Sequence, residues 1–214
     1  MSVVVDPAAR RQSLRGPAVL ISLAGLAALV FFGLAAVPYL MSSAYNANQY
    51  AGRRGPLLVH IAFGTVALFT GPIQLWLGIA ERRMQLHRQL GVVYIAAVTV
   101  GSAAAYVIAL SPSGGWIFGA GLMGLATAWL TTTFMAFLAI KRSLMEQHKE
   151  WMIRSYVVTF AFVVFRIGST IGGAIKPEAG LEFAQTMAWA CWAVPLLVTE
   201  LILQGRKILR VAAA

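Results

Sequence analysis

Two long stretches of this sequence contain no charged residue, and they limit what the chain can fold into. They cover residues 16–52 and 89–140. A helix needs about 20 apolar residues to cross the hydrocarbon core of a membrane, so the first stretch holds one spanning helix and the second holds two. Only 11% of the residues are charged and 59% are hydrophobic, against about 25% charged residues in soluble domains. The sequence therefore predicts an all-α, multi-pass membrane protein.

Six spanning helices are expected from the apolar runs and the turns between them. The turn residues 111–115 divide the second charge-free stretch into two helices. Pro72 is expected to kink the second helix, since neighbouring helices in a membrane can bond the freed carbonyl. A cytoplasmic arm (1–15) and tail (206–214) are expected to flank a membrane domain at 16–205. The expected helices are 17–41, 56–80, 90–110, 116–140, 151–175 and 182–204.

The basic residues predict the orientation of this bundle. Thirteen Lys and Arg residues lie in the arm, in segments 81–89 and 141–154, and in the tail, whereas only Arg53, Arg54 and Lys176 flank the helices on the opposite side. The positive-inside rule then places both termini in the cytoplasm, here of a bacterial inner membrane. The net charge of +10 comes from these short flanking clusters, so we expect contact with the lipid bilayer and no binding of nucleic acid.

Arg166 is the strongest functional signal, because an arginine inside a membrane indicates a functional site by default. It lies about fifteen residues into the expected helix 151–175, roughly 22 Å from its cytoplasmic end at 1.5 Å per residue. His60 is expected at a similar depth in helix 56–80. We predict that both side chains line one polar pocket in the outer half of the bundle, with Glu182, a lipid phosphate or a ligand carboxylate as the counter-charge.

Structural roles remain as alternatives for both residues. Gly64 and Gly71 share a helix face with His60, so this face allows either close helix packing or the approach of a flat cofactor. In the packing case His60 bonds a hydroxyl or a carbonyl group. Arg166 alternatively extends its side chain to the outer interface.

His87 and His148 lie at the cytoplasmic ends of the third and fifth expected helices, each beside a basic residue. One interpretation is that both face solvent or lipid headgroups. The other is that they face each other and bind the iron of a b-type haem, because histidine is a common axial ligand. A zinc site is not expected from three histidines at two depths. Cys191 lies in an apolar run and is expected to be a small core residue.

Spaced motifs between about residues 57 and 167 resemble those of DUF2306, a family of bacterial membrane proteins without an established activity. The first block is His60, Gly64, Ala67-Leu68 and Gly71-Pro72-x-Gln74; the second is His87-Arg88-x-x-Gly91-x-x-Tyr94; the third is Trp129-x-x-Thr132 with Ala136 and Ile140, then His148-x-x-Trp151-Met152-x-Arg154-Ser155-Tyr156 with Arg166.

This family is in turn distantly similar to the two-haem b-type cytochromes, whose haems lie between alternate helices. That similarity implies a haem held by His87 and His148, a transmembrane electron carrier or quinone reductase, and Arg166 near a haem propionate. His60 would belong to a second haem, but the helix at 116–140 contains no histidine to pair with it. The alternative is an accessory or assembly factor without a cofactor. A transporter is disfavoured because helix interiors lack the acidic residues of a proton relay.

Overall fold

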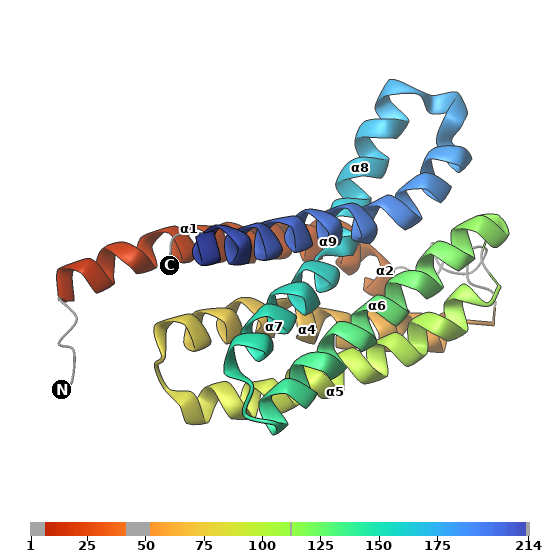
Figure 1. Ribbon diagram of the computed structural model, residues 1–214. Helices are drawn as coiled ribbons and strands as arrows, with labels where there is room; N and C mark the ends of the chain where they lie inside the picture. Colours follow the sequence, from red (N-terminus) through yellow and green to blue (C-terminus); the bar gives the residue numbers. More distant parts are fainter. Residues whose placement is uncertain (1–6, 42–51, 112, 213–214) are drawn as a thin grey trace.

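The computed structural model describes residues 7–41, 52–111 and 113–212, and it is helical almost throughout these ranges (Figure 1). Within them, six helical segments are long and apolar enough to cross a membrane, namely 14–36, 54–80, 84–109, 115–141, 145–175 and 177–209. The prediction of an all-α bundle with six spanning helices is confirmed. Most of the connection between the first two expected helices, residues 42–51, lies outside the described residues.

The first span begins earlier than the sequence predicted. Helix α1 (Pro7–Phe31) starts within the predicted arm and continues through a π-helical turn, η1 (Phe32–Ala36), into α2 (Val37–Met41). The next three spans are α4 (Arg54–Ala80), α5 (Met84–Ala109) and α6 (Gly115–Lys141). The last part of the chain comprises α7 (Met145–Thr159), α8 (Ala161–Ile175), the 3-10 turn η2 (Pro177–Ala179) and α9 (Gly180–Ala212).

Two hairpins, α4–α5 and α6–α7, form the centre of the bundle. Their connections, residues 81–83 and 142–144, contain left-handed residues that reverse the chain: Glu81, Arg83 and Ser143 have φ of 51°, 48° and 59°. In Figure 1 both connections lie toward the same end of the bundle as the start of α1 and the end of α9. This arrangement agrees with an even number of spans. His87 and His148 each occupy the fourth position of the helix that follows.

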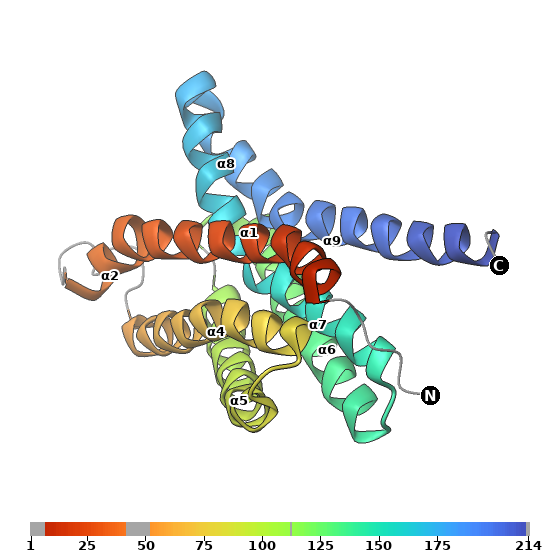
Figure 2. The same ribbon diagram turned by 90° about the vertical axis from the view of Figure 1, so that its left-hand side faces the viewer.

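The expected fifth helix, 151–175, lies within one spanning segment, 145–175, but this segment is not one continuous helix. The structure divides it at Phe160, whose carbonyl accepts bonds from the amides of Val163 and Val164 at 3.0 and 3.3 Å. Just before this point the Thr159 hydroxyl donates to the Ser155 carbonyl at 2.9 Å, a bond type that bends helices. Helix α8 and the start of α9 consequently stand away from the rest of the bundle (Figures 1 and 2). The depth of Arg166 therefore cannot be measured along one axis.

Helices α4 and α7 pack against each other at the turn before Pro72. Proline has no amide hydrogen and leaves the carbonyl four residues earlier without its helical donor. That carbonyl belongs to Leu68, and the hydroxyl of Tyr156 donates to it at 3.3 Å. Gly71 makes room for the tyrosine, since a Cβ there would lie 2.1 Å from Cε2 of the ring. A neighbouring helix thus supplies the hydrogen bond to the carbonyl that Pro72 leaves without a donor, as predicted.

Small and aromatic residues fill the centre of the bundle. Tyr94, Val98 and Ala161 are fully buried, and Cys191 is buried among them, as expected of a core residue. Trp129 of α6 packs in the same cluster. In contrast, the spans expose many large apolar side chains on their outer faces, which suits helices surrounded by lipid.

Candidate functional site

A cavity of about 480 Å³ lies in the half of the bundle away from the connections 81–83 and 142–144, and we call it the outer cavity. Most of its wall is apolar, with polar groups at a few positions, which is the usual composition of a small-molecule site. Helices α1, α4, α5, α6, α7, α8 and α9 all contribute to it. The polar and charged residues on its wall are Arg53, His60, Thr65, Ser113, Thr159 and Arg166.

His60 occupies the α4 wall of the outer cavity in a defined hydrogen-bonding state. Its Nδ1 lies 2.9 Å from the carbonyl oxygen of Gly101 on α5. A carbonyl only accepts, so Nδ1 carries the proton, and in the neutral ring Nε2 keeps its lone pair for a second partner. Trp129 and Phe162 hold the ring, with centroids at 6.5 and 5.9 Å. The bond to a carbonyl, expected in the packing alternative, therefore coexists with a place on the cavity wall.

Two arginines also line this cavity. Arg53 is anchored at the end of α5, where its Nη1 donates to the carbonyl of Ile108 at 2.9 Å and to that of Ser111. A cation there complements the negative end of the helix dipole. Arg166 reaches the cavity from α8. His60 and Arg166 thus share one cavity despite the break at Phe160. Glu200, the acidic residue within the last apolar run, lies at the other end of the bundle and is paired with Arg154.

The two glycines that share a face with His60 have different surroundings. Gly64 lines the outer cavity, and a Cβ added there would meet nothing within 4 Å. Gly71 packs against the ring of Tyr156. Open space beside His60 is therefore limited to the turn around Gly64, and the turn around Gly71 is a helix contact.

A buried network of hydroxyl groups extends inward from the cavity wall. The hydroxyl of Thr159, which lines the cavity, bonds that of Tyr94 at 2.7 Å and accepts the indole N–H of Trp129 at 2.8 Å. Tyr94 also bonds Ser155 at 2.8 Å, and Ser155 bonds Thr133 at 2.7 Å. These bonds join α5, α6 and α7 directly. The sequence offered a signal for this network, because Tyr94 and Ser155 each follow a histidine by seven residues.

That spacing places His87 and Tyr94 on one face of α5, and His148 and Ser155 on one face of α7. The two histidines lie near enough for their charges to interact. His148 Nδ1 donates to the carbonyl of Ala136 at 2.9 Å, while His87 packs against Gly78. Neither ring lines the outer cavity or the second cavity described below.

Tyr94 and Ser155, seven residues after His87 and His148, are both fully buried. The described residues contain no group of three or more histidine, cysteine or acidic side chains placed to hold a metal ion. The His87–His148 haem remains a prediction.

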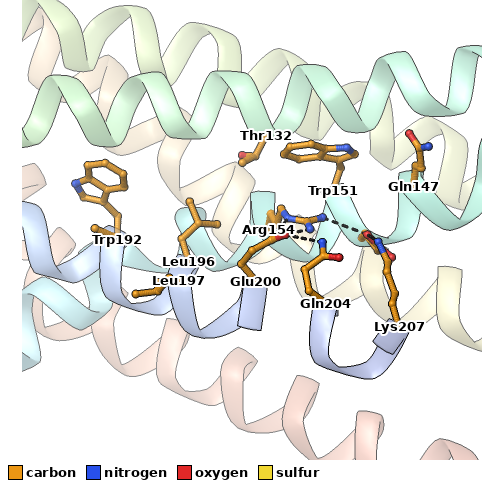
Figure 3. A pocket seen from close by; sticks show the side chains of 12 residues that line it. Thr132, Gln147, Trp151, Arg154, Trp192, Leu196, Leu197, Glu200, Gln204 and Lys207 are labelled. Atoms are coloured by element: carbon orange, nitrogen blue, oxygen red, sulfur yellow. Dashed lines mark hydrogen bonds and ion pairs between the residues drawn. The ribbon is translucent and has the colours of Figure 1, made fainter. Parts of the chain in front are cut away.

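A second cavity, of about 630 Å³, lies between α7 and α9 near the connection 142–144, and we call it the inner cavity (Figure 3). Its charged residues are Glu150, Arg154, Glu200 and Lys207. The guanidinium of Arg154 is 2.6 Å from Glu200 and 3.6 Å from Glu150. The sequence placed Arg154 among the flanking charges and in the third motif block but did not indicate its partner, and the residue is only 7% exposed. The signal available was Glu200, an acidic residue at the same end of the membrane.

Comparison with known proteins gives one match. The family described as "Predicted membrane protein (DUF2306)" matches residues 57–203, which include most of α4, all of α5 to α8 and most of α9. No curated protein matches the chain. No solved structure matches it either.

Proposed function

Because the chain belongs to the DUF2306 family of predicted membrane proteins, we propose that its function is carried by the outer cavity. We infer that the cavity binds a membrane-soluble molecule with an apolar body and an oxygen-bearing head group, such as a quinone or a long-chain carboxylic acid. The bacterial inner membrane, with both chain termini in the cytoplasm, is the proposed location. The observation behind the proposal is that His60 and Arg166 line one largely apolar cavity.

The polar groups on the wall are matched to such a head group. Arg166 supplies N–H donors in a planar fork that suits a carboxylate or a carbonyl oxygen. Nε2 of neutral His60 accepts a hydrogen bond, as from the hydroxyl of a quinol or of a protonated acid. Phe118, Leu122 and Phe165 are among the apolar residues beside them. A head group with both a donor and an acceptor therefore meets both residues.

Equilibrium binding of two probes tests the proposal: radiolabelled palmitate and a short-chain ubiquinone analogue, each with the detergent-solubilised full chain. We expect saturable binding of at least one probe. Arg166→Leu should abolish binding of palmitate, and Arg166→Lys should restore it in part because lysine lacks the planar fork. Gly64→Leu should block both probes by filling the open space beside His60.

Lys176→Leu is the matched control, since Lys176 is exposed at the same end of the bundle and does not line the cavity. The proposal fails if neither probe binds, or if the Arg166 and Gly64 variants bind both probes as the Lys176 variant does.

A b-type haem electron carrier is a second candidate, favoured by the matching positions of His87 and His148. Each is the fourth residue of a helix, α5 or α7, that starts at the same end of the bundle. Its test is the absorption spectrum of protein produced with added haem precursor. A Soret band that is lost in both His87→Ala and His148→Ala would support the carrier. A spectrum without haem bands would reject the haem carrier. The outer-cavity proposal and the alternative of an accessory factor without a cofactor would remain.

A further inference from the structure

We propose that the inner cavity binds one zwitterionic phospholipid of the adjacent leaflet, with a phosphoethanolamine head group. This inference is independent of the outer cavity. The occupant is deduced from the order of polar and apolar residues along the cavity, from the balance of charges, and from the exposure of the charged groups.

Polarity changes steadily along the α9 wall of the inner cavity. Trp192, Leu196 and Leu197 lie toward the middle of the bundle, Glu200 follows, and Gln204 and Lys207 lie toward the chain end (Figure 3). Apart from the adjacent Leu196 and Leu197, these positions recur at three- and four-residue intervals, so they share one face of the helix. A phospholipid has the same order, with acyl chains toward the membrane centre and a charged head at the interface.

The charges around the cavity are balanced and alternate in sign. Arg154 lies between two carboxylates, those of Glu200 at 2.6 Å and Glu150 at 3.6 Å. Lys207 reaches back to Glu150 at 2.8 Å. Two cations and two anions give no net attraction for a purely anionic lipid. A head group with an ammonium and a phosphate finds a partner for each.

The exposed fractions of the side chains separate the buried charged group from those that a lipid can reach. Arg154 is 8% exposed, and its guanidinium also stacks 4.7 Å from the ring centroid of Trp151. Glu200 bonds Arg154 and Gln204, and Lys207 bonds Glu150, but these two side chains are 42% and 49% exposed and can also contact a head group. We therefore assign the ammonium of the lipid to Glu200 and the phosphate to Lys207, while the Arg154–Glu200 pair holds α9 against α7. A primary ammonium donates three hydrogen bonds, whereas a choline head group donates none.

Native mass spectrometry of the full chain tests this assignment. The detergent-solubilised protein is mixed with phosphatidylethanolamine, phosphatidylcholine and phosphatidylglycerol of identical acyl chains. We expect the ethanolamine lipid to be retained most. Glu200→Gln should remove its advantage over the choline lipid. Lys207→Gln should lower its bound fraction about tenfold, the effect of losing one charge-assisted hydrogen bond.

Two variants with the same charge changes serve as controls. Arg206→Gln is next to Lys207, and Glu178→Gln lies in η2; both residues are exposed, and neither lines the cavity. Both should retain the lipid as the wild type does. Lys207→Gln leaves the Arg154–Glu200 pair intact, so its result does not depend on correct folding of the Glu200 variant.

Soluble phosphoethanolamine, added in equal amount, distinguishes a lipid from a free zwitterion. It should not displace the lipid, because it has no chains to lie along the apolar part of α9. Equal retention of the three lipids would overturn the proposal, as would a preference unchanged in both cavity variants. Displacement by soluble phosphoethanolamine would reject a lipid as the occupant.

Discussion

Gly64 and Gly71 lie two turns apart on one face of α4, and an added methyl group would meet different surroundings at the two positions. At Gly71 a Cβ would lie 2.1 and 2.2 Å from two ring atoms of Tyr156. Gly71→Ala should therefore destabilise the protein by about 1–3 kcal/mol, the usual cost of overpacking. Gly64→Ala should change stability by less than about 1 kcal/mol, because nothing is displaced.

Thermal unfolding of the two purified variants in one detergent checks this difference. Equal loss of stability in both would show that Tyr156 does not occupy the space beside Gly71.

Arg154 and Glu200 should behave as a coupled pair. Arg154 is the buried partner, so removing Glu200 leaves its charge with only Glu150 at 3.6 Å. Replacing both partners is less costly. Glu200→Ala should lower the midpoint of unfolding, and adding Arg154→Met should restore part of it. A double-mutant cycle measures the coupling. If the two effects simply add, the contact at 2.6 Å contributes no coupling energy.

For single residues, the sequence indicated which polar and charged side chains lie inside the membrane, but it did not indicate which of them contact each other. The depth argument brought His60 and Arg166 to one region, since both lie well inside apolar runs. The Arg154–Glu200 pair was missed because Arg154 lies close to a basic loop and was counted with it. Sequence spacing fixes the face of a helix, whereas the contacts depend on how α7 and α9 cross.

Thr159 lies at the last position of α7 and joins three helices through its hydroxyl group. Thr159→Val keeps the shape of the side chain but removes a partner from both Tyr94 and Trp129. Tyr94 keeps its bond to Ser155, but the indole N–H of Trp129 loses its bond to Thr159. Leaving a buried donor without its partner costs about 1–3 kcal/mol, so the unfolding midpoint should fall. Thr99→Val is the control, because Thr99 is exposed and donates to the carbonyl of Ile95 in its own helix. A similar loss of stability in both variants would contradict the network.

The helices themselves were largely predictable, and the differences have physical causes. The expected helix 90–110 extends from Met84 to Ala109 in the structure, because its first turns are polar and the apolar run marks only the part within hydrocarbon. The break at Phe160 had no such signal, since residues 156–164 contain neither proline nor glycine. It coincides instead with the bonds of Thr159, which involve residues distant in sequence.

For the whole molecule, the basic residues predict the orientation, and this prediction is open to a direct test. The single cysteine, Cys191, is 1% exposed, so new cysteines can be labelled without replacing it. Ser113→Cys, before α6, should react with a membrane-impermeant maleimide added outside intact cells. Ser143→Cys, between α6 and α7, should react only after the membrane is opened. The reverse pattern would invert the assigned orientation.

The contact between Tyr156 and Leu68 also sets an order of events during biosynthesis. Helix α4 leaves the ribosome well before α7, because 88 residues separate the two partners of this bond. Until α7 arrives, the Leu68 carbonyl has neither the amide that Pro72 lacks nor the tyrosine hydroxyl, and unsatisfied backbone groups are costly in lipid. The first hairpin thus enters the membrane with the Leu68 carbonyl lacking a hydrogen-bond donor. The carbonyl gains its donor only when the second hairpin packs against the first, so newly made α4 depends on a later part of its own chain.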